Sequence, residues 1–149
     1  MLGITPEDMN MAYKLLTATF LGGLIGFERE AHGKEAGFRT YALVCLGSAL
    51  IMVVSVQIFE IYQGLAEVDP GRVAAQVVSG VGFLGAGAII RYPQGVKGLT
   101  TAAGIWTAAG IGLACGIGAF HSAIVTTVLA LLILIVFSKV NRMLEARNS

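Results

Sequence analysis

Charged side chains are scarce in this sequence. They make up 13% of its 149 residues, and hydrophobic residues reach 56%, whereas soluble domains carry about 25% charged residues. The longest segment without Asp, Glu, Lys or Arg covers residues 98–138. As a straight helix it would measure roughly 60 Å, enough for two crossings of a ~30 Å hydrocarbon core. The composition therefore indicates an integral membrane protein and excludes an ordinary soluble domain.

Cysteines and dense basic clusters are also few. The two cysteines, Cys45 and Cys115, lie in apolar segments, where a free thiol behaves as a small apolar side chain, so a disulfide framework is not expected. The net charge of +1 comes without a row of Lys and Arg that could neutralise phosphates, and nucleic acid is not an expected partner. Residues 1–9 contain acids but no Lys or Arg, unlike a cleavable signal peptide, so we expect the first apolar run to be a retained span.

Catalytic motifs are missing as well. The sequence has no H-E-x-x-H and no C-x-x-C, and its histidines, His32 and His121, fall on opposite sides of the expected bundle. Residues 80–85 match G-x-G-x-x-G, but nucleotide binding also requires a βαβ unit and an acid ~20 residues further on. The next acid after Gly85 is Glu145. We therefore expect no enzyme activity and no cofactor. Five acids lie near the N-terminus and around the end of the second apolar run, namely Glu7, Asp8, Glu60, Glu67 and Asp69. A hard divalent cation prefers such oxygens, but scattered loop carboxylates usually stay solvated, so the sequence alone neither predicts nor excludes a metal site there.

Apolar segments alternate with polar ones along the chain. This pattern predicts an all-α, polytopic transmembrane helical bundle of about five spans, near residues 9–27, 40–61, 73–90, 100–115 and 119–138. The charged connection at residues 28–39 is expected in water or at the membrane interface. Residues 91–101 are expected to form a turn-rich loop, and residues 139–149 a short polar tail.

Helix caps are predicted at the start of three spans. Thr5 and Asp8 are spaced as a capping box around Pro6 at the start of the first helix. Asp69, followed by Pro70, is the expected cap of the third helix. Thr100 or Thr101 is expected to cap the fourth.

The distribution of basic residues predicts the orientation. If five spans alternate, residues 28–39, residues 91–101 and the tail share one side, which then holds all of the 10 Lys and Arg except Lys14 and Arg72. Basic residues concentrate on the cytoplasmic side of membrane proteins. We therefore predict an outside N-terminus and a cytoplasmic C-terminus, with residues 1–149 forming a single transmembrane domain.

Small residues recur every four positions in three spans. The sequence has 20 glycines, about twice the usual share. The small faces comprise Ala18, Gly22 and Gly26 in the first span, the two pairs Ala75 with Ser79 and Gly82 with Ala86 in the third, and Gly104, Ala108, Gly112 and Gly116 in the fourth. Because such faces let helices approach closely in lipid, we expect these three spans to form the tight bundle and the second and fifth to face lipid. The alternative is that the small residues leave room for a pore or hinge.

Four segments of the sequence together resemble one protein family. They are GFERE at residues 26–30, KEAGFRT at 34–40, DPGRVAAQVVSGVGFLGAG at 69–87, and GLTTAA at 98–103 followed by Trp106. On these segments the chain resembles the MgtC/SapB/YhiD family of bacterial inner-membrane proteins, and the long central segment is very specific. The resemblance extends from residue 22 to about residue 118 and implies a multi-pass protein of the bacterial inner membrane.

The resemblance also implies a function and a set of site residues. It implies a role in magnesium homeostasis, in adaptation to low magnesium and, in some pathogens, in virulence. The implied mechanism is non-enzymatic modulation of other membrane proteins, namely ATP synthase or cation-transporting P-type ATPases. Better-known members continue into a soluble C-terminal domain, which we do not expect in residues 1–149. The positions matching the family signature are Glu28, Arg29, Gly37, Arg39, Thr40, Asp69, Arg72, Gln76, Gly80, Gly82, Gly85, Gly98, Thr100, Thr101 and Trp106.

A second hypothesis is a small channel or transporter, oligomeric, for a cation or small solute. The third span is short and interrupted by glycines, and interrupted spans are where transporters place their binding sites. Gln76 within it is the candidate lining residue. The alternative role for Gln76 is a hydrogen bond to a neighbouring helix.

Overall fold

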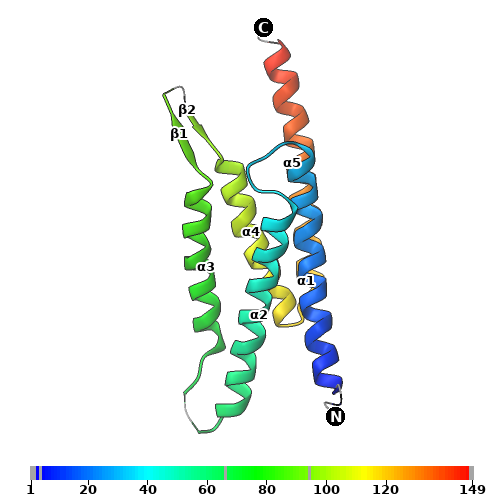
Figure 1. Cartoon of the computed structure of the whole chain (residues 1–149), viewed down its shortest axis with the longest axis vertical. Helices are drawn as coiled ribbons and strands as arrows, with labels where there is room; N and C mark the ends of the chain where they lie inside the picture. The colour runs from blue at the N-terminus through cyan, green and yellow to red at the C-terminus, as the bar shows by residue number, and fades with distance from the viewer. Residues whose placement is uncertain (1–2, 4, 66, 94, 148–149) are drawn as a thin grey trace.

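A computed structural model describes residues 3, 5–65, 67–93 and 95–147 (Figure 1). In order, these residues form α1 (Pro6–Ala31), α2 (Phe38–Tyr62), α3 (Pro70–Gly87), β1 (Ile90–Tyr92), β2 (Gly95–Lys97), α4 (Leu99–Gly116) and α5 (Phe120–Arg147). The expected helical fold is confirmed, and each predicted span corresponds to one helix. The strands form one small antiparallel hairpin within the segment expected to be a loop.

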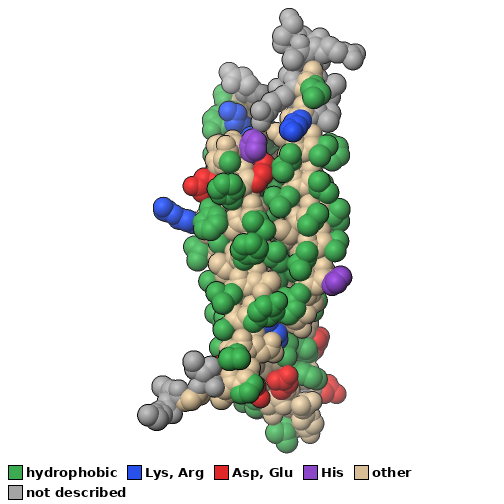
Figure 2. Space-filling model, turned by 90° about the vertical axis from the view of Figure 1, so that its right-hand side faces the viewer, with side chains coloured by type: hydrophobic (Ala, Val, Ile, Leu, Met, Phe, Trp, Pro, Cys, Tyr) green, Lys and Arg blue, Asp and Glu red, His purple; other side chains and the backbone are tan. Residues whose placement is uncertain are grey.

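Three of the described helices are long and apolar enough to cross a membrane. They are α2, α4 and the part of α5 up to Lys139. α1 and α3 do not reach this level, and in α3 the cause is its many glycines together with Arg72 and Gln76. Figure 2 shows hydrophobic side chains covering the face formed by α1 and α5 along most of its length. Five crossings, and the side that each end faces, stay predictions.

The helices alternate in direction, so the connections collect at two ends (Figure 1). The α1–α2 connection, the hairpin and the C-terminal end of α5 lie at one end, called the basic end below because residues 28–39, 91–101 and 139–147 carry most of the Lys and Arg. The N-terminus and the α2–α3 connection lie at the opposite end. This grouping is the one on which the predicted orientation depends.

Two predicted helix caps are confirmed and one is wrong. The Thr5 and Asp8 side chains each accept from the other's backbone N–H, at 3.2 and 2.9 Å, in a full capping box. Asp69 accepts from the Gly71 N–H at 2.8 Å. α4, however, is capped by neither of the predicted threonines. Its N-cap is Gly98, in the left-handed conformation with φ of 87°.

α2 lies at the centre of the bundle, packed against α1 and α4, and this corrects the prediction that the first, third and fourth spans form the tight bundle. α2 contacts both α1 and α4 closely, because the small faces of those two helices point at α2. A Cβ added at Gly22 would lie 2.6 Å from the Tyr41 carbonyl oxygen, and one at Gly116 would lie 2.7 Å from the Ala49 carbonyl oxygen. The second span is therefore central, although it was expected to face lipid.

α3 and α5 lie at the periphery of the bundle. α3 buries Val77, Val81 and Gly85 against its neighbours, whereas Gly80 and Gly82 have open space where a side chain would project. In α5 only 11% of the apolar window is buried, which agrees with its predicted exposure. The close packing expected from the small face of the third span is therefore not found.

Two helices extend beyond the predicted spans. α1 continues to Ala31, through residues that were expected to form a connection in water or at the interface. α5 continues to Arg147, through the residues expected to form a polar tail. The extension of α1 matters most, because it carries Glu28 and Arg29 into the helix bundle.

Candidate functional site

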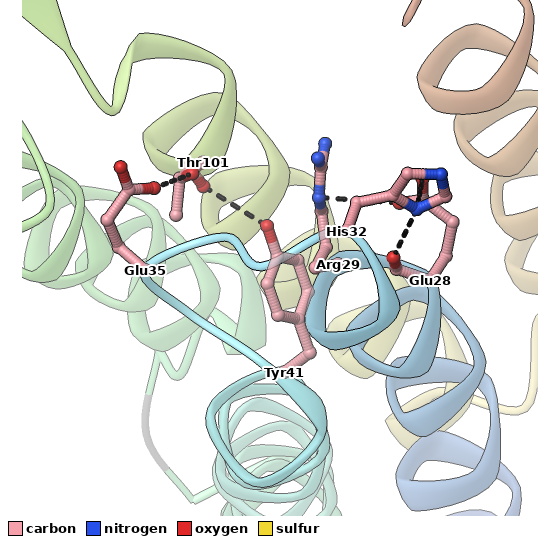
Figure 3. A network of polar contacts seen from close by, with 6 residues as sticks. All are labelled: Glu28, Arg29, His32, Glu35, Tyr41 and Thr101. Carbon is pink, nitrogen blue, oxygen red and sulfur yellow. Dashed lines mark hydrogen bonds and ion pairs between the residues drawn. The ribbon is translucent and has the colours of Figure 1, made fainter.

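A polar cluster lies at the basic end, where α1, α2 and α4 meet (Figure 3). α1 contributes two of its side chains, the α1–α2 connection two, and the first turns of α2 and α4 one each. The members of the polar cluster are Glu28, Arg29, His32, Glu35, Tyr41 and Thr101.

Glu28 and Arg29 form a buried ion pair within the polar cluster. Their side chains are 8% and 4% exposed, and Arg29 Nε lies 3.3 Å from Glu28 Oε2. His32, one helical turn further on, places Nδ1 3.0 Å from Glu28 Oε1 and 2.8 Å from the Glu28 carbonyl oxygen. Among the described residues, neither Glu28 carboxylate oxygen nor Arg29 Nε has a partner with hydrogen-bond geometry. Buried charges of this kind are costly unless paired. Glu28 and Arg29 are therefore expected to depend on each other inside the mostly apolar bundle.

A second part of the polar cluster ties the α1–α2 connection to α4. The Thr101 hydroxyl donates to Glu35 Oε2 at 3.0 Å, and the Tyr41 hydroxyl donates to the Thr101 carbonyl oxygen at 3.3 Å. The backbone N–H of Glu35 and the Thr101 hydroxyl hold the pKa of the Glu35 carboxyl below its usual value. Tyr41 fits here because Gly104 has no side chain, and an added Cβ would overlap the Tyr41 hydroxyl.

An apolar groove runs along the outside of the bundle between α2 and α3. Its volume is about 460 Å³. Gln76 is the polar α3 side chain on its wall, and Gly80, one turn further on, leaves the wall open. The other lining residues are Leu43, Val44, Gly47, Ser48, Ile51, Val73, Val77, Val81 and Leu84. We call this feature the α2–α3 groove.

Within the described ranges, no group of three or more His, Cys, Asp and Glu side chains is placed so that it could hold a metal ion. The polar cluster offers hydrogen bonding and charge pairing, and the α2–α3 groove offers apolar contact.

Comparison with known proteins decides the family. The sequence pattern of the MgtC family matches residues 15–143. The chain belongs to the MgtC family. A relative in Escherichia coli K12, named "Putative magnesium transporter YhiD", is 46% identical over 137 residues, which are 91% of this chain and 64% of the relative. Protein MgtC of Salmonella typhimurium LT2 is 47% identical over 117 residues, which are 78% of this chain and 48% of that protein.

The chain thus spans between about half and two thirds of the length of these MgtC-family relatives. No solved structure matches it. The matched region covers α2, α3 and α4 completely and most of α1 and α5, since it begins within α1 and ends within α5. The family resemblance stated from the sequence is therefore confirmed.

The MgtC-family signature positions do not converge on one site. At the basic end lie Glu28, Arg29, Gly37, Arg39, Thr40, Gly98, Thr100 and Thr101. At the opposite end lie Asp69 and Arg72, at the start of α3. Within α3 and α4 lie Gln76, Gly80, Gly82, Gly85 and Trp106, of which Gly85 is in the last turn of α3. Of all these positions, the polar cluster contains Glu28, Arg29 and Thr101.

Three members of the polar cluster were not among the predicted site residues. His32 could have been found, because it stands four residues after Glu28 and such residues meet on one helix face. Glu35 lies within a segment that carries the family resemblance, but only the fold reveals its contact with Thr101. Tyr41 gives no sequence signal, because its partner is 60 residues away.

Proposed function

We propose that this MgtC-family chain is a non-enzymatic modulator of larger membrane proteins in magnesium homeostasis. The observation that carries the proposal is the α2–α3 groove, which is open and apolar, lies on the side of the bundle and has one amide, Gln76, on its wall. Its occupant is a transmembrane helix of the partner. In the orientation that we propose, the basic end with its polar cluster faces the cytoplasm, where the partner's soluble parts would lie.

Physical chemistry favours a helix as the occupant. Helices in lipid associate through close backbone approach and interhelical hydrogen bonds, since lipid gives them little hydrophobic reason to meet. Gly80 has no atom within contact distance of the position its Cβ would take. Gln76 is exposed on the same wall, one turn away. A partner helix can therefore pack closely at Gly80 and bond its backbone or a polar side chain to the Gln76 amide.

The partners that the family resemblance implies are ATP synthase and cation-transporting P-type ATPases. Both are multi-span complexes of the bacterial inner membrane, the location that we also propose for this chain. Relatives named for MgtC and for magnesium transport support the connection with magnesium. Low-magnesium adaptation and virulence belong to the same proposal.

A second candidate is a small oligomeric channel or transporter for Mg²⁺. It is favoured by the printed name of the Escherichia coli relative and by the position of Gln76 in the α2–α3 groove. In this alternative, two copies would face each other across their grooves, and the Gln76 amides would line the path.

One pair of experiments separates the two candidates. The full chain is co-reconstituted with a purified magnesium P-type ATPase or with ATP synthase, and complex formation and ATP hydrolysis are measured. Gly80→Leu fills the groove and is expected to abolish the complex. Gly110→Leu is the matched control, because Gly110 is likewise an exposed helical glycine with open space around it, on α4.

The second experiment uses the chain alone in liposomes. No Mg²⁺ flux is expected without a partner. Selective Mg²⁺ flux that disappears in Gln76→Ala would overturn the modulator and favour the transporter. Equal complex formation by the two leucine variants would exclude the α2–α3 groove as the docking surface.

A further inference from the structure

The β1–β2 hairpin extends beyond the ends of α3 and α4 at the basic end, where α5 reaches further still (Figure 1). It pairs Ile90 with Lys97, Arg91 with Val96, and Tyr92 with Gly95, and every one of these residues is exposed. An isolated two-stranded hairpin is marginally stable in water and needs a surface to pack on. The described residues of the protein do not supply that surface.

The hairpin is both apolar and basic. Ile90 and Tyr92 remain 44% exposed and Val96 48% exposed. Directly paired residues share a face of an antiparallel ribbon, so Lys97 lies on the face of Ile90 and Tyr92, with its Nζ 5.3 Å from the Tyr92 ring centroid. Arg91 lies on the other face, with Val96.

The positive charge of the hairpin has no local compensation. Between Asp69 and Glu145 the sequence contains no Asp or Glu. The salt bridges found among the described residues involve neither Arg91 nor Lys97. Two basic side chains therefore project from an apolar ribbon with their charges available to an outside partner.

The base of the hairpin is fixed to the bundle. Gly98 sits directly against the Ala88 carbonyl oxygen, which an added Cβ would overlap, and its φ of 87° directs the chain into α4. Ile89 and Leu99, on either side of the hairpin, are exposed apolar residues at the helix ends. In a membrane-spanning bundle, this places the hairpin at the level where the hydrocarbon meets the headgroups.

We infer that the β1–β2 hairpin is a lipid-binding element that recognises anionic phospholipid headgroups. Arg91 and Lys97 pair with the lipid phosphates, Tyr92 takes the interfacial position that tyrosines favour in membranes, and Ile90 and Val96 contact the upper acyl chains. Charge complementarity is the reason for choosing an anionic lipid, since basic segments next to membranes are attracted to anionic leaflets. The inference does not depend on the proposed function.

Depth-dependent quenching tests the inference on the full chain. Tyr92→Trp in a Trp106→Phe background leaves one tryptophan, located in the hairpin. This protein is reconstituted into vesicles of phosphatidylcholine and phosphatidylglycerol in which one lipid or the other is brominated. Quenching by brominated phosphatidylglycerol is expected to exceed quenching by brominated phosphatidylcholine at equal fractions, and to fall to the same level when Arg91→Gln and Lys97→Gln are added.

The control is Arg72→Gln, which removes an exposed basic residue at the opposite end and is expected to leave the preference unchanged. In parallel, native mass spectrometry of the chain with its natural Tyr92 is expected to show retained phosphatidylglycerol that is lost in the Arg91→Gln, Lys97→Gln variant. Equal quenching by both lipids together with equal retention would overturn the inference. Quenching that disappears as the ratio of protein to lipid rises would also overturn the inference, because it would indicate that the hairpin pairs edge to edge with a second copy.

Discussion

Tyr41 of α2 donates its hydroxyl hydrogen to the backbone carbonyl of Thr101 in α4, at 3.3 Å and across 60 residues of sequence. The contact is buried, and it lies beside Gly104, whose missing side chain provides the space for the phenol. It joins α2 to α4 and is part of the polar cluster.

The first prediction concerns the coupling between Tyr41 and Gly104. Tyr41→Phe removes one buried hydrogen bond and is expected to cost about 1 kcal/mol. Gly104→Ala introduces a methyl group that overlaps the Tyr41 hydroxyl, and overpacking of this kind costs ~1–3 kcal/mol. Because the hydroxyl is the overlapping atom, the double variant is expected to be more stable than the sum of the single effects. Unfolding in detergent measures all four proteins, and strict additivity would contradict this geometry.

The second prediction concerns the buried ion pair. Glu28→Ala leaves the Arg29 charge without its carboxylate, and breaking a buried pair from one side costs ~3–5 kcal/mol. The double variant Glu28→Leu, Arg29→Met removes both charges and is expected to recover most of that loss. Glu7→Ala, at an exposed position in the first turn of α1, serves as the control with little effect. Unfolding of Glu28→Ala at the same midpoint as the control would show that the pair is not buried in the protein.

The third prediction is a pH dependence of the α1–α2 connection. The pKa of the Glu35 carboxyl is lowered in the folded protein. The stability that the ionised carboxylate contributes is therefore present above the usual carboxyl pKa and is lost as pH falls through the lowered value. We expect the connection to loosen in that acidic range. Trypsin cleavage after Lys34 can be measured after a brief acid pulse and return to neutral pH. This cleavage rises only if the connection refolds slowly.

A direct measurement uses hydrogen exchange of residues 33–37 as pH is lowered, corrected for the intrinsic exchange rate. Thr101→Val removes the hydroxyl that bonds to Glu35 and is expected to reduce protection already at neutral pH. Thr100→Val is the matched control, since Thr100 is exposed one residue away. If both valine variants exchange like the parent protein at neutral pH, Thr101 does not anchor the connection.

The fourth prediction tests which helices form the core. Gly112→Ala places a methyl group against the Cys45 carbonyl oxygen of α2 and is expected to destabilise the protein by ~1–3 kcal/mol. Gly80→Ala and Gly110→Ala project into open space and are expected to be neutral or slightly stabilising, because alanine favours helix. If Gly80→Ala were as damaging as Gly112→Ala, α3 would belong to the tight bundle that the sequence pattern predicted.

Local features of the fold could be predicted from the sequence, whereas which helix packs against which could not. Thr5 with Asp8, and Asp69 with Pro70, act on their own helix ends, so their roles follow from spacing alone. α2 carries Arg39, Gln57 and Glu60 only towards its ends, and its most apolar window has a mean hydropathy of 2.4, so no face of its middle part indicates a partner. The small faces of α1 and α4 were identified, but the helix that they pack against was not.

The candidate site shows the same limit. The charges at residues 28–39 indicated a connection in water or at the membrane interface, because consecutive Glu and Arg are expensive in a membrane. Burial of Glu28 and Arg29 follows from the continuation of α1 to Ala31 and from the packing of α1 against α2 and α4. The cap of α4 was missed because the reason for a glycine at position 98 is its close approach to Ala88, where a side chain would overlap the Ala88 carbonyl oxygen. Only the fold reveals that contact.

The central position of α2 has a consequence for how the protein is made. Residues of α2 such as Tyr41 and Cys45 hydrogen-bond to α4 residues that are 60 and 63 positions later in the chain. A ribosome has therefore already synthesised α3 and the hairpin before the partner of α2 exists. During that interval the surface of α2 that later receives Gly112 and Gly116 is exposed to lipid or to the insertion machinery, and the bundle can close only after α4 has entered the membrane.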